Sequence, residues 1–227
     1  NTGLTVLRVS LADLDESTRE GMELAVLGSS YGVSQGELVL ALGSPIGYSG
    51  SVSGGVITSV TNKVSTLDTE YNLLTTDING SQDGSGVLIN LNGEIVGIIA
   101  QSYSSENIVT ALPISQVKSL IESLSNNEAR PYIGIKGQDV TEQISATTGI
   151  PKGVLVTSVQ ADSPAMLAGI KEYDVIAAVG DEKVSTIRQY RDCLDDLSPG
   201  QTVSVTAMRR GASGYAEVVF EVSVGEI

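Results

Sequence analysis

Apolar residues in the first half of the chain come in short runs separated by polar turns, which is the pattern of a protein built from β-strands. The strongest signal is a pair of apolar runs, Val87–Leu91 and Glu94–Ile99, on either side of Asn92-Gly93. An Asn-Gly pair in this setting predicts a β-hairpin. A polar, glycine-rich turn over residues 79–86 precedes it. Such a turn could hold a nucleophile on the rigid scaffold of a β-barrel enzyme.

Further strands are expected on both sides of this hairpin, over residues 1–9, 24–28, 37–42, 51–61 and 108–112. Pro45 fixes the backbone of the turn over 43–47, and Gly54-Gly55 predicts a bulge or bend. Residues 62–72 are polar and are expected to form a surface loop. Pro113 begins a helix over 114–124, whose apolar residues recur at helical spacing.

The second half of the chain begins after a polar linker over residues 125–130. A family resemblance, given below, implies a helix over 185–197 and strands over 202–209 and 215–224. A chain of 227 residues has room for two domains, each with its own core.

Composition narrows the range of partners and cofactors. The net charge is −14, from 13 basic and 27 acidic residues, and no basic cluster occurs. Nucleic acids and anionic membrane surfaces need a positive patch, so neither is an expected partner. No run approaches the ~20 apolar residues of a membrane span. No metal-ligand cluster or cofactor motif is found, and the lone Cys193 is interpreted as a buried small residue rather than a reactive thiol.

Residues 74–99 resemble a motif of the HtrA family of trypsin-fold serine proteases, T-D-A-x-I-N-x-G-N-S-G-G-x-L-[VI]-N-x-x-G-x-[VIL]-[VIL]-G-I. Residues 24–47 resemble a second motif of this family, which ends in G-[NS]-P-x-G. The first match is fixed from its hairpin side by Gly93, Asn90, Leu88, Gly86 and Ser85.

In this register Gly84 takes the position of the catalytic serine, Asp83 that of an asparagine, and Gln82 that of the glycine that shapes the oxyanion turn. A rival register makes Ser85 the nucleophile. It requires a deletion in a short strand, where a shift of one residue turns every side chain to the other face. We therefore favour Gly84, which predicts a protease site without its nucleophile.

A second triad position, that of the aspartate, also lacks its residue. Residues 1–9 resemble the family strand whose aspartate orients the catalytic histidine, and Gly3 stands in place of that aspartate. The chain contains no histidine, which in the family would precede Asn1, in the first of two six-stranded barrels. Asp13 and Asp15 are other carboxylates nearby, but their spacing does not match the family.

The second half resembles a PDZ domain of the kind that HtrA proteases carry. The matching segments are Arg130–Ile135, Pro151–Val156, Ser163–Gly169 and Tyr173–Ile176, with Tyr173 in place of the usual glycine. PDZ domains bind an extended peptide along an exposed edge strand, here expected to begin at Ile133.

The peptide groove can be assigned to particular residues through this resemblance. The loop Tyr132, Ile133 and Gly134 is expected to present backbone N–H groups to a terminal carboxylate. Strand alternation places Ile133 and Ile135 on one side, which favours a groove lining over a core position. The opposite wall is expected to contain Ile187, Tyr190 and Leu194, which share one helix face, although Leu194 and Leu197 fit a core position better.

We therefore predict a mainly β chain. Residues 1–124 form a partial trypsin-like protease domain, mostly its second six-stranded barrel, residues 125–130 a linker, and residues 131–227 an α+β PDZ domain. The favoured function is that of a pseudoprotease that binds peptides or protein C-termini. One alternative is an active HtrA-type serine endopeptidase with Ser85 as nucleophile and its histidine barrel outside this chain. Another is a structural subunit whose PDZ domain regulates assembly.

The resemblance also implies partners and a location. HtrA proteins act in protein quality control outside the cytoplasm or in the cell envelope, often as trimers or larger assemblies. A homo-oligomer is therefore expected, without direct membrane insertion of this chain. Any membrane anchor would belong to a segment ahead of Asn1.

Overall fold

The computed structural model describes residues 2–104 and 106–227, which form two compact units. The barrel unit comprises Thr2–Val64 and Tyr71–Asn127. The C-terminal unit comprises Ser65–Glu70 and Glu128–Ile227. Ser65–Glu70 is the tip of a hairpin, and it packs as part of the C-terminal unit although its strands run out of the barrel unit. The predicted fold class, mainly β with a six-stranded barrel and a following α+β domain, is confirmed.

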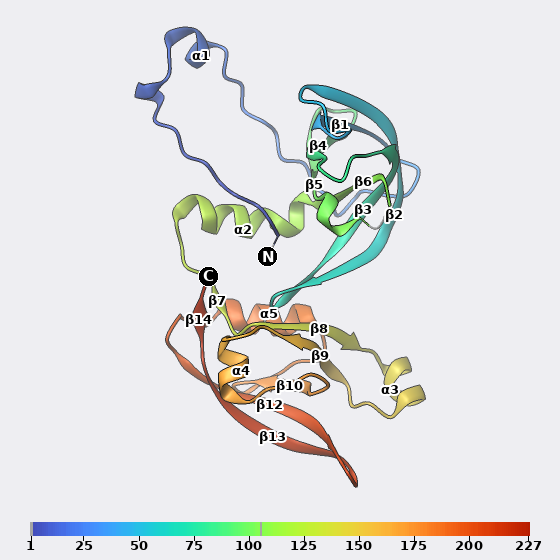
Figure 1. Ribbon diagram of the computed structural model, residues 1–227, viewed down its shortest axis with the longest axis vertical. Helices are drawn as coiled ribbons and strands as arrows, with labels where there is room; N and C mark the ends of the chain where they lie inside the picture. The colour runs from blue at the N-terminus through green and yellow to red at the C-terminus, as the bar shows by residue number, and fades with distance from the viewer. Residues whose placement is uncertain (1, 105) are drawn as a thin grey trace. The chain divides into compact units, whose positions relative to one another are not determined.

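The barrel unit contains a closed barrel with the strand order β1-β2-β3-β6-β5-β4 (Figure 1). The strands are β1 Leu38–Ser44, β2 Ser51–Thr66, β3 Thr69–Asn79, β4 Ser85–Ile89, β5 Ile95–Ile99 and β6 Ile108–Pro113. Closure leaves the barrel without a free edge, which strands otherwise expose. Its interior is filled by small and branched apolar side chains, among them Val39, Ala41, Ile57, Leu88, Val109 and Ala111. The helix α2, Ile114–Asn126, begins directly after β6 and ends at Asn127 in a left-handed conformation.

The predicted hairpin is formed by β4 and β5, but its turn is longer than two residues. The loop spans residues 90–94, and the Asn90 side-chain oxygen accepts hydrogen bonds from the backbone N–H groups of Asn92 and Glu94. Gly93 has φ +79°, in the region that favours glycine. Asn-Gly therefore marks the hairpin correctly, while Asn90 sets the length of its loop.

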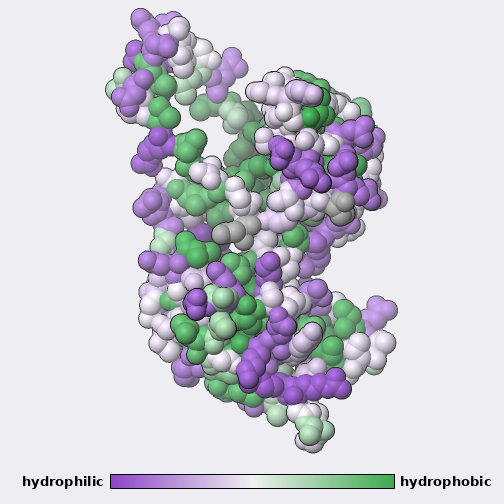
Figure 2. Space-filling model, in the orientation of Figure 1, coloured by the Kyte–Doolittle hydropathy of each residue, from purple (hydrophilic) through white to green (hydrophobic). Residues whose placement is uncertain are grey.

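Two strands predicted near the N-terminus are not formed. Residues 2–9 lie in irregular backbone, with Leu7 86% exposed, because no partner strand is available among the described residues. Asn1, also part of that prediction, lies outside the described residues. The 24–28 stretch makes only an isolated bridge between Leu27 and Ile95. The short helices that separate these stretches, η1 Leu11–Asp13 and α1 Glu16–Glu20, contain no buried residue. Apolar and hydrophilic side chains are consequently mixed on the surface of the N-terminal segment (Figure 2).

Two predictions along β2 are also wrong. The Gly54-Gly55 pair continues the β1–β2 register without a bulge. Gly55 instead permits close approach, because a Cβ there would lie 2.2 Å from an Asp77 carboxylate oxygen. Residues 62–72, predicted as a surface loop, continue β2 and β3 up to a tight turn at Leu67-Asp68. The strands were not predicted because these residues are mostly polar and lack the usual alternation of apolar and polar positions.

The C-terminal unit is built on a sheet of order β13-β12-β10-β9-β8, with the short β11, Glu182–Lys183, paired to β10. The strands are β8 Ile135–Val140, β9 Gly153–Val159, β10 Val175–Val179, β12 Thr202–Gly211 and β13 Gly214–Ser223, and β7 Pro131–Tyr132 pairs with β14 Gly225–Glu226. The helices are α3 Glu142–Thr148, α4 Pro164–Ala168 and α5 Ile187–Asp195. β8 is therefore an edge strand, as a peptide-binding PDZ sheet requires.

A buried ion pair fixes the start of β10. Asp174 is 1% exposed, and Arg209 binds its two carboxylate oxygens through Nε and Nη2 at 2.7 and 2.6 Å. The Lys171 backbone N–H donates to the same carboxylate at 2.8 Å. Hydrogen bonding to Asp174 raises the pKa of Arg209. The guanidinium also lies 5.1 Å from the centre of the Phe220 ring. Loss of Arg209 would leave the Asp174 charge buried without its partner, which destabilises the fold.

The residue before this pair is strained. Tyr173 has φ +71°, a left-handed conformation that costs L-residues roughly 1–2 kcal/mol. Its side chain is 70% exposed, so packing does not compensate for this cost. Tyr173→Gly should raise the free energy of unfolding by about 1 kcal/mol, measured by chemical denaturation. Tyr173→Ala is the matched control, because it removes the ring but keeps the Cβ. Equal effects of both variants would show that the ring, not the backbone, sets the stability.

Candidate functional site

The turn predicted to hold the protease nucleophile is tightly closed. The Ser81 N–H donates to the Pro45 carbonyl at 2.9 Å, and the Gly84 N–H donates to the Ser81 carbonyl at 2.8 Å. The buried side chain of Gln101 links the turn to β6. Its Nε2 donates to the Ser81 carbonyl, and its Oε1 accepts from the Thr110 N–H. In the predicted register the Gly84 amide is one of two that would bind an oxyanion. In this structure the Gly84 amide instead donates to the Ser81 carbonyl of the same turn.

Gly84 also has no space for a side chain. A Cβ built on it would lie 2.6 Å from the Pro45 carbonyl oxygen, 2.8 Å from the Ser81 carbonyl oxygen and 3.1 Å from Gln101 Cγ. Gln82 and Asp83, the predicted oxyanion-turn residues, are exposed at the corner of the turn. The turn is thus shaped around glycine at the predicted nucleophile position.

The alternative nucleophile, Ser85, is exposed and begins β4, paired with Ser44 of β1. An attacking serine needs a base within hydrogen-bond distance, and the chain supplies no imidazole. Gly3, the position predicted to have lost the orienting aspartate, lies in irregular backbone with φ +73°, and a Cβ there would meet nothing within 4 Å. The described residues therefore bring no triad together in either register.

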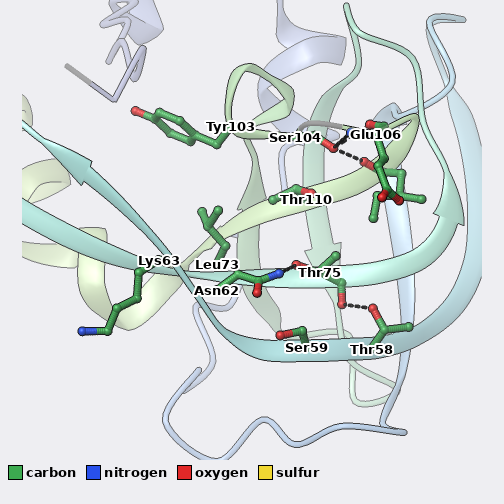
Figure 3. Close-up of a pocket in the computed structure, with 11 residues that line it drawn as sticks. Thr58, Ser59, Asn62, Lys63, Leu73, Thr75, Tyr103, Ser104, Glu106 and Thr110 are labelled. Carbon is green, nitrogen blue, oxygen red and sulfur yellow. Dashed lines mark hydrogen bonds between the residues drawn. The ribbon is translucent and has the colours of Figure 1, made fainter. Parts of the chain in front are cut away.

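The barrel unit has a polar pocket elsewhere, between β2, β3 and the 101–110 segment (Figure 3). Asn62 Nδ2 donates to Thr75 Oγ1 at 3.1 Å, and Thr58 Oγ1 donates to the Thr75 carbonyl at 3.1 Å. The Tyr103 ring borders the same pocket, and burial followed by the neighbouring Tyr71 raises its pKa. None of the predicted site residues lines this pocket.

The loop between β7 and β8 forms a backbone site for an anion. Its carbonyls are anchored: that of Ile133 accepts from the Ala165 N–H at 2.8 Å, and that of Gly134 from the Gln160 N–H at 2.9 Å. Gly134 has φ +92°, and a Cβ there would lie 2.4 Å from Ser163 Cβ, so only glycine fits. Anchored in this way, the N–H groups of Ile133, Gly134 and Ile135 converge on one point.

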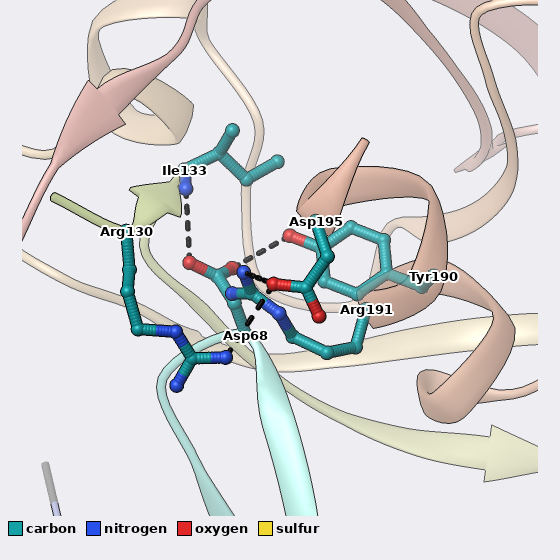
Figure 4. A network of polar contacts seen from close by, with 6 residues as sticks. All are labelled: Asp68, Arg130, Ile133, Tyr190, Arg191 and Asp195. Carbon is teal, nitrogen blue, oxygen red and sulfur yellow. Dashed lines mark hydrogen bonds and ion pairs between the residues drawn. The ribbon is translucent and has the colours of Figure 1, made fainter. Parts of the chain in front are cut away.

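The carboxylate of Asp68 occupies this point (Figure 4). The Ile133 and Gly134 N–H groups donate to Oδ2 at 2.9 and 2.8 Å, and the Ile135 N–H donates to Oδ1 at 3.1 Å. The Tyr190 hydroxyl from α5 donates to Oδ1 at 2.6 Å. Asp68 is 0% exposed, and these four donors supply the hydrogen bonds that a buried carboxylate needs.

A charged cluster surrounds the carboxylate. Arg191 and Arg130 both form ion pairs with Asp195 (Figure 4), and the Arg130 Nη2 atom lies 3.4 Å from Asp195 Oδ1. The pKa of Arg191 is raised: burial opposes the shift, while the Asp195 hydrogen bond and the charges of Asp195 and Asp68 outweigh it. The pKa of Tyr190 is raised well above its usual value by burial and then by the Asp68 charge, so the phenol keeps its proton and acts as a donor. A protonated phenol and a charged guanidinium both favour an anion at the position of the Asp68 carboxylate.

The structure places the predicted groove residues as follows. The side chains of Ile133, Ile135, Ile187, Tyr190 and Leu194 are at most 3% exposed and belong to the core of the C-terminal unit. The edge strand begins at Ile135 and not at Ile133, because Pro131–Tyr132 pairs with β14. Ile133 and Ile135 thus present backbone N–H groups to the Asp68 carboxylate, while their side chains are buried. The Tyr132 ring packs over Gly225 and borders Gly134.

Sequence reasoning missed three residues of this site: Asp68, Arg191 and Asp195. Asp68 lies in a polar run 65 residues before its amide donors. An aspartate at a hairpin tip has no local signature of such a contact. Arg191 and Asp195 are four residues apart on α5, and this spacing is the only signal that could have found their ion pair.

Three further observations limit the chemistry of the described residues. Burial, followed by the nearby charges of Glu182, Asp192 and Asp196, raises the pKa of the Cys193 thiol, which disfavours the reactive thiolate. Among those residues no group of three or more His, Cys, Asp or Glu side chains is placed to hold a metal ion. No helix in the described ranges has the length and apolarity needed to span a membrane.

Comparison with known proteins matches both units. Residues 131–219 match the PDZ domain family. The chain is 33% identical over 225 residues to Serine protease Do-like HtrB of Bacillus subtilis (strain 168), covering 88% of the chain and 49% of that protein. It is 31% identical to a protein named probable periplasmic serine endoprotease DegP-like of Rhizobium meliloti (strain 1021), covering 91% of the chain and 42% of that protein.

Solved structures show the same likeness. The HtrA-type protease AlgW with a decapeptide is 26% identical, with a TM-score of 0.59, and the match covers 89% of this chain and 64% of that one. The structure of AlgW with a tripeptide has the same identity and TM-score, and the match covers 69% of that chain. The chain spans about half the length of the curated relatives named here.

A closed trypsin-like barrel followed by a PDZ domain defines the class of this protein. Within that class, the chain is similar to HtrA-type serine proteases.

The packing around Gly84 gives a direct test of the closed turn. Gly84→Ser should lower the free energy of unfolding by about 1–3 kcal/mol, because its Cβ would overlap two carbonyl oxygens. It should also fail to hydrolyse an unfolded protein such as casein. Gly32→Ser is the matched control, since a Cβ at Gly32 meets nothing within 4 Å, and it should be nearly neutral. A Gly84→Ser variant as stable as Gly32→Ser would show that the turn has room for a nucleophile.

Proposed function

We propose that this chain binds the C-terminal ends of peptides or proteins through its PDZ domain. The observation that carries the proposal is the set of three backbone N–H groups, from Ile133, Gly134 and Ile135, that bind a carboxylate next to the edge strand β8. A peptide's terminal carboxylate has the same chemistry as the aspartate carboxylate found there. An extended peptide can then add to β8 through main-chain hydrogen bonds.

In the same proposal the barrel acts as a scaffold and not as a protease. The closed turn around Gly84 and the glycine at position 3 support this role. By analogy with the relative named as periplasmic, the protein would act outside the cytoplasm, in protein quality control. A homo-oligomer stays a prediction.

The second candidate is an active HtrA-type endopeptidase with Ser85 as its nucleophile. The exposure of Ser85 at the start of β4 favours it. This activity would need a histidine from outside the chain. Cleavage of casein by a longer form of the protein, abolished by Ser85→Ala, would establish this candidate and overturn the scaffold role.

The peptide-binding role predicts selectivity for a free C-terminus. Ten-residue peptides with an apolar last residue should shift the backbone amide NMR signals of Ile133, Gly134 and Ile135 in the full chain. The same peptides with an amidated C-terminus should bind at least about tenfold more weakly, because amidation removes a charged hydrogen-bond acceptor. Equal binding of acid and amide, or no shift with either at millimolar peptide, would overturn this role.

A further inference from the structure

Two residues of the β2–β3 hairpin tip, Ser65 and Asp68, form hydrogen bonds to the edge of β8. Besides its carboxylate contacts, Asp68 donates its own N–H to the Ile135 carbonyl at 2.7 Å. Three residues earlier, the Ser65 hydroxyl donates to the Gly137 carbonyl at 3.0 Å and accepts from the Gly137 N–H at 3.2 Å. Both backbone groups of Ile135 and of Gly137 are therefore bonded to the tip.

These are the backbone groups that an added peptide strand would use. Residues two apart on an edge strand direct their N–H and C=O groups to the same side, and in β8 these are Ile135 and Gly137. The tip thus takes both the carboxylate position and the strand position of a peptide ligand. A second ligand cannot bind the same N–H groups while Asp68 holds them.

We infer that the hairpin tip Ser65–Asp68 is a built-in ligand of the PDZ groove, and that a peptide C-terminus binds only by displacing it. This inference rests on the proposed peptide-binding function. The occupant is a segment of this chain, and its carboxylate reproduces the charge and the acceptor atoms of a peptide C-terminus.

The conformation of Asp68 fits this role. Its φ is +56°, a left-handed value that aspartate and asparagine adopt more readily than other non-glycine residues. This conformation turns the chain at the tip, so that one residue presents both an N–H group and a carboxylate to the loop. A tethered occupant competes at a high effective concentration and lowers the apparent affinity for free peptide by the fraction of open molecules.

Asp68→Asn separates charge from shape, because asparagine keeps the left-handed turn but loses the carboxylate. Asp181→Asn is the matched control: it changes the same charge at an exposed turn of the same unit. The probe is a fluorescein-labelled ten-residue peptide with a C-terminal valine and a free carboxylate, and its amide is the reference. Fluorescence anisotropy with the full chain should show about tenfold tighter binding of the acid to Asp68→Asn than to wild type or Asp181→Asn.

A second measurement does not depend on any peptide. Hydrogen exchange of the Gly134 and Gly137 amides should be slow in wild type and in Asp181→Asn. In Asp68→Asn it should be at least about tenfold faster, because the groove is then open for a larger fraction of the time.

The outcomes separate the inference from the proposed function. Tighter acid binding with faster exchange in Asp68→Asn supports both. Equal peptide affinity in wild type and Asp68→Asn overturns the built-in ligand and leaves peptide binding intact. Faster exchange with no peptide binding to any variant supports occupation of the groove by the tip and overturns the proposed function. Unchanged exchange in Asp68→Asn overturns the inference whatever the peptides do.

Discussion

The burial of one carboxylate organises the C-terminal unit around its ligand groove. Asp68 is fully buried, and its charge is tolerable only because three backbone amides and a phenol converge on it. Those donors depend in turn on the anchored carbonyls of Ile133 and Gly134 and on the packing of α5. A carboxylate in this position therefore ties a hairpin tip, a loop and a helix into one cooperative set of hydrogen bonds.

The barrel shows a different use of glycine. In the β7–β8 loop, Gly134 creates a site because its positive φ directs amides outward. In the 81–84 turn, Gly84 closes one, since two carbonyl oxygens and Gln101 fill the space that a side chain would take. The same residue type thus marks a working anion site in one unit and a filled turn in the other.

Much of this architecture could be predicted from the sequence, because apolar alternation and turn residues encode it locally. The β4–β5 hairpin and the strand and helix around Pro113 were predictable in this way, while the elements of the PDZ domain were predicted through the family resemblance. The failures have physical causes. Residues 2–9 have the pattern of a strand but lack a partner, and residues 62–72 form strands whose polar side chains conceal them. The contact of Asp68 with Ile133 joins positions 65 residues apart, and no local pattern could reveal it.

Every protein chain ends in a carboxylate, so an empty loop of three amides would meet a large excess of irrelevant C-termini in any cellular compartment. A groove that already holds Asp68 sets a lower limit on the affinity that a partner must have. Every C-terminus would bind more weakly by the same factor, so that at a given concentration the weak ones would leave Asp68 in place and only tight ones would displace it. The hairpin tip would then act as a threshold on recognition, set by the four donors that hold one aspartate.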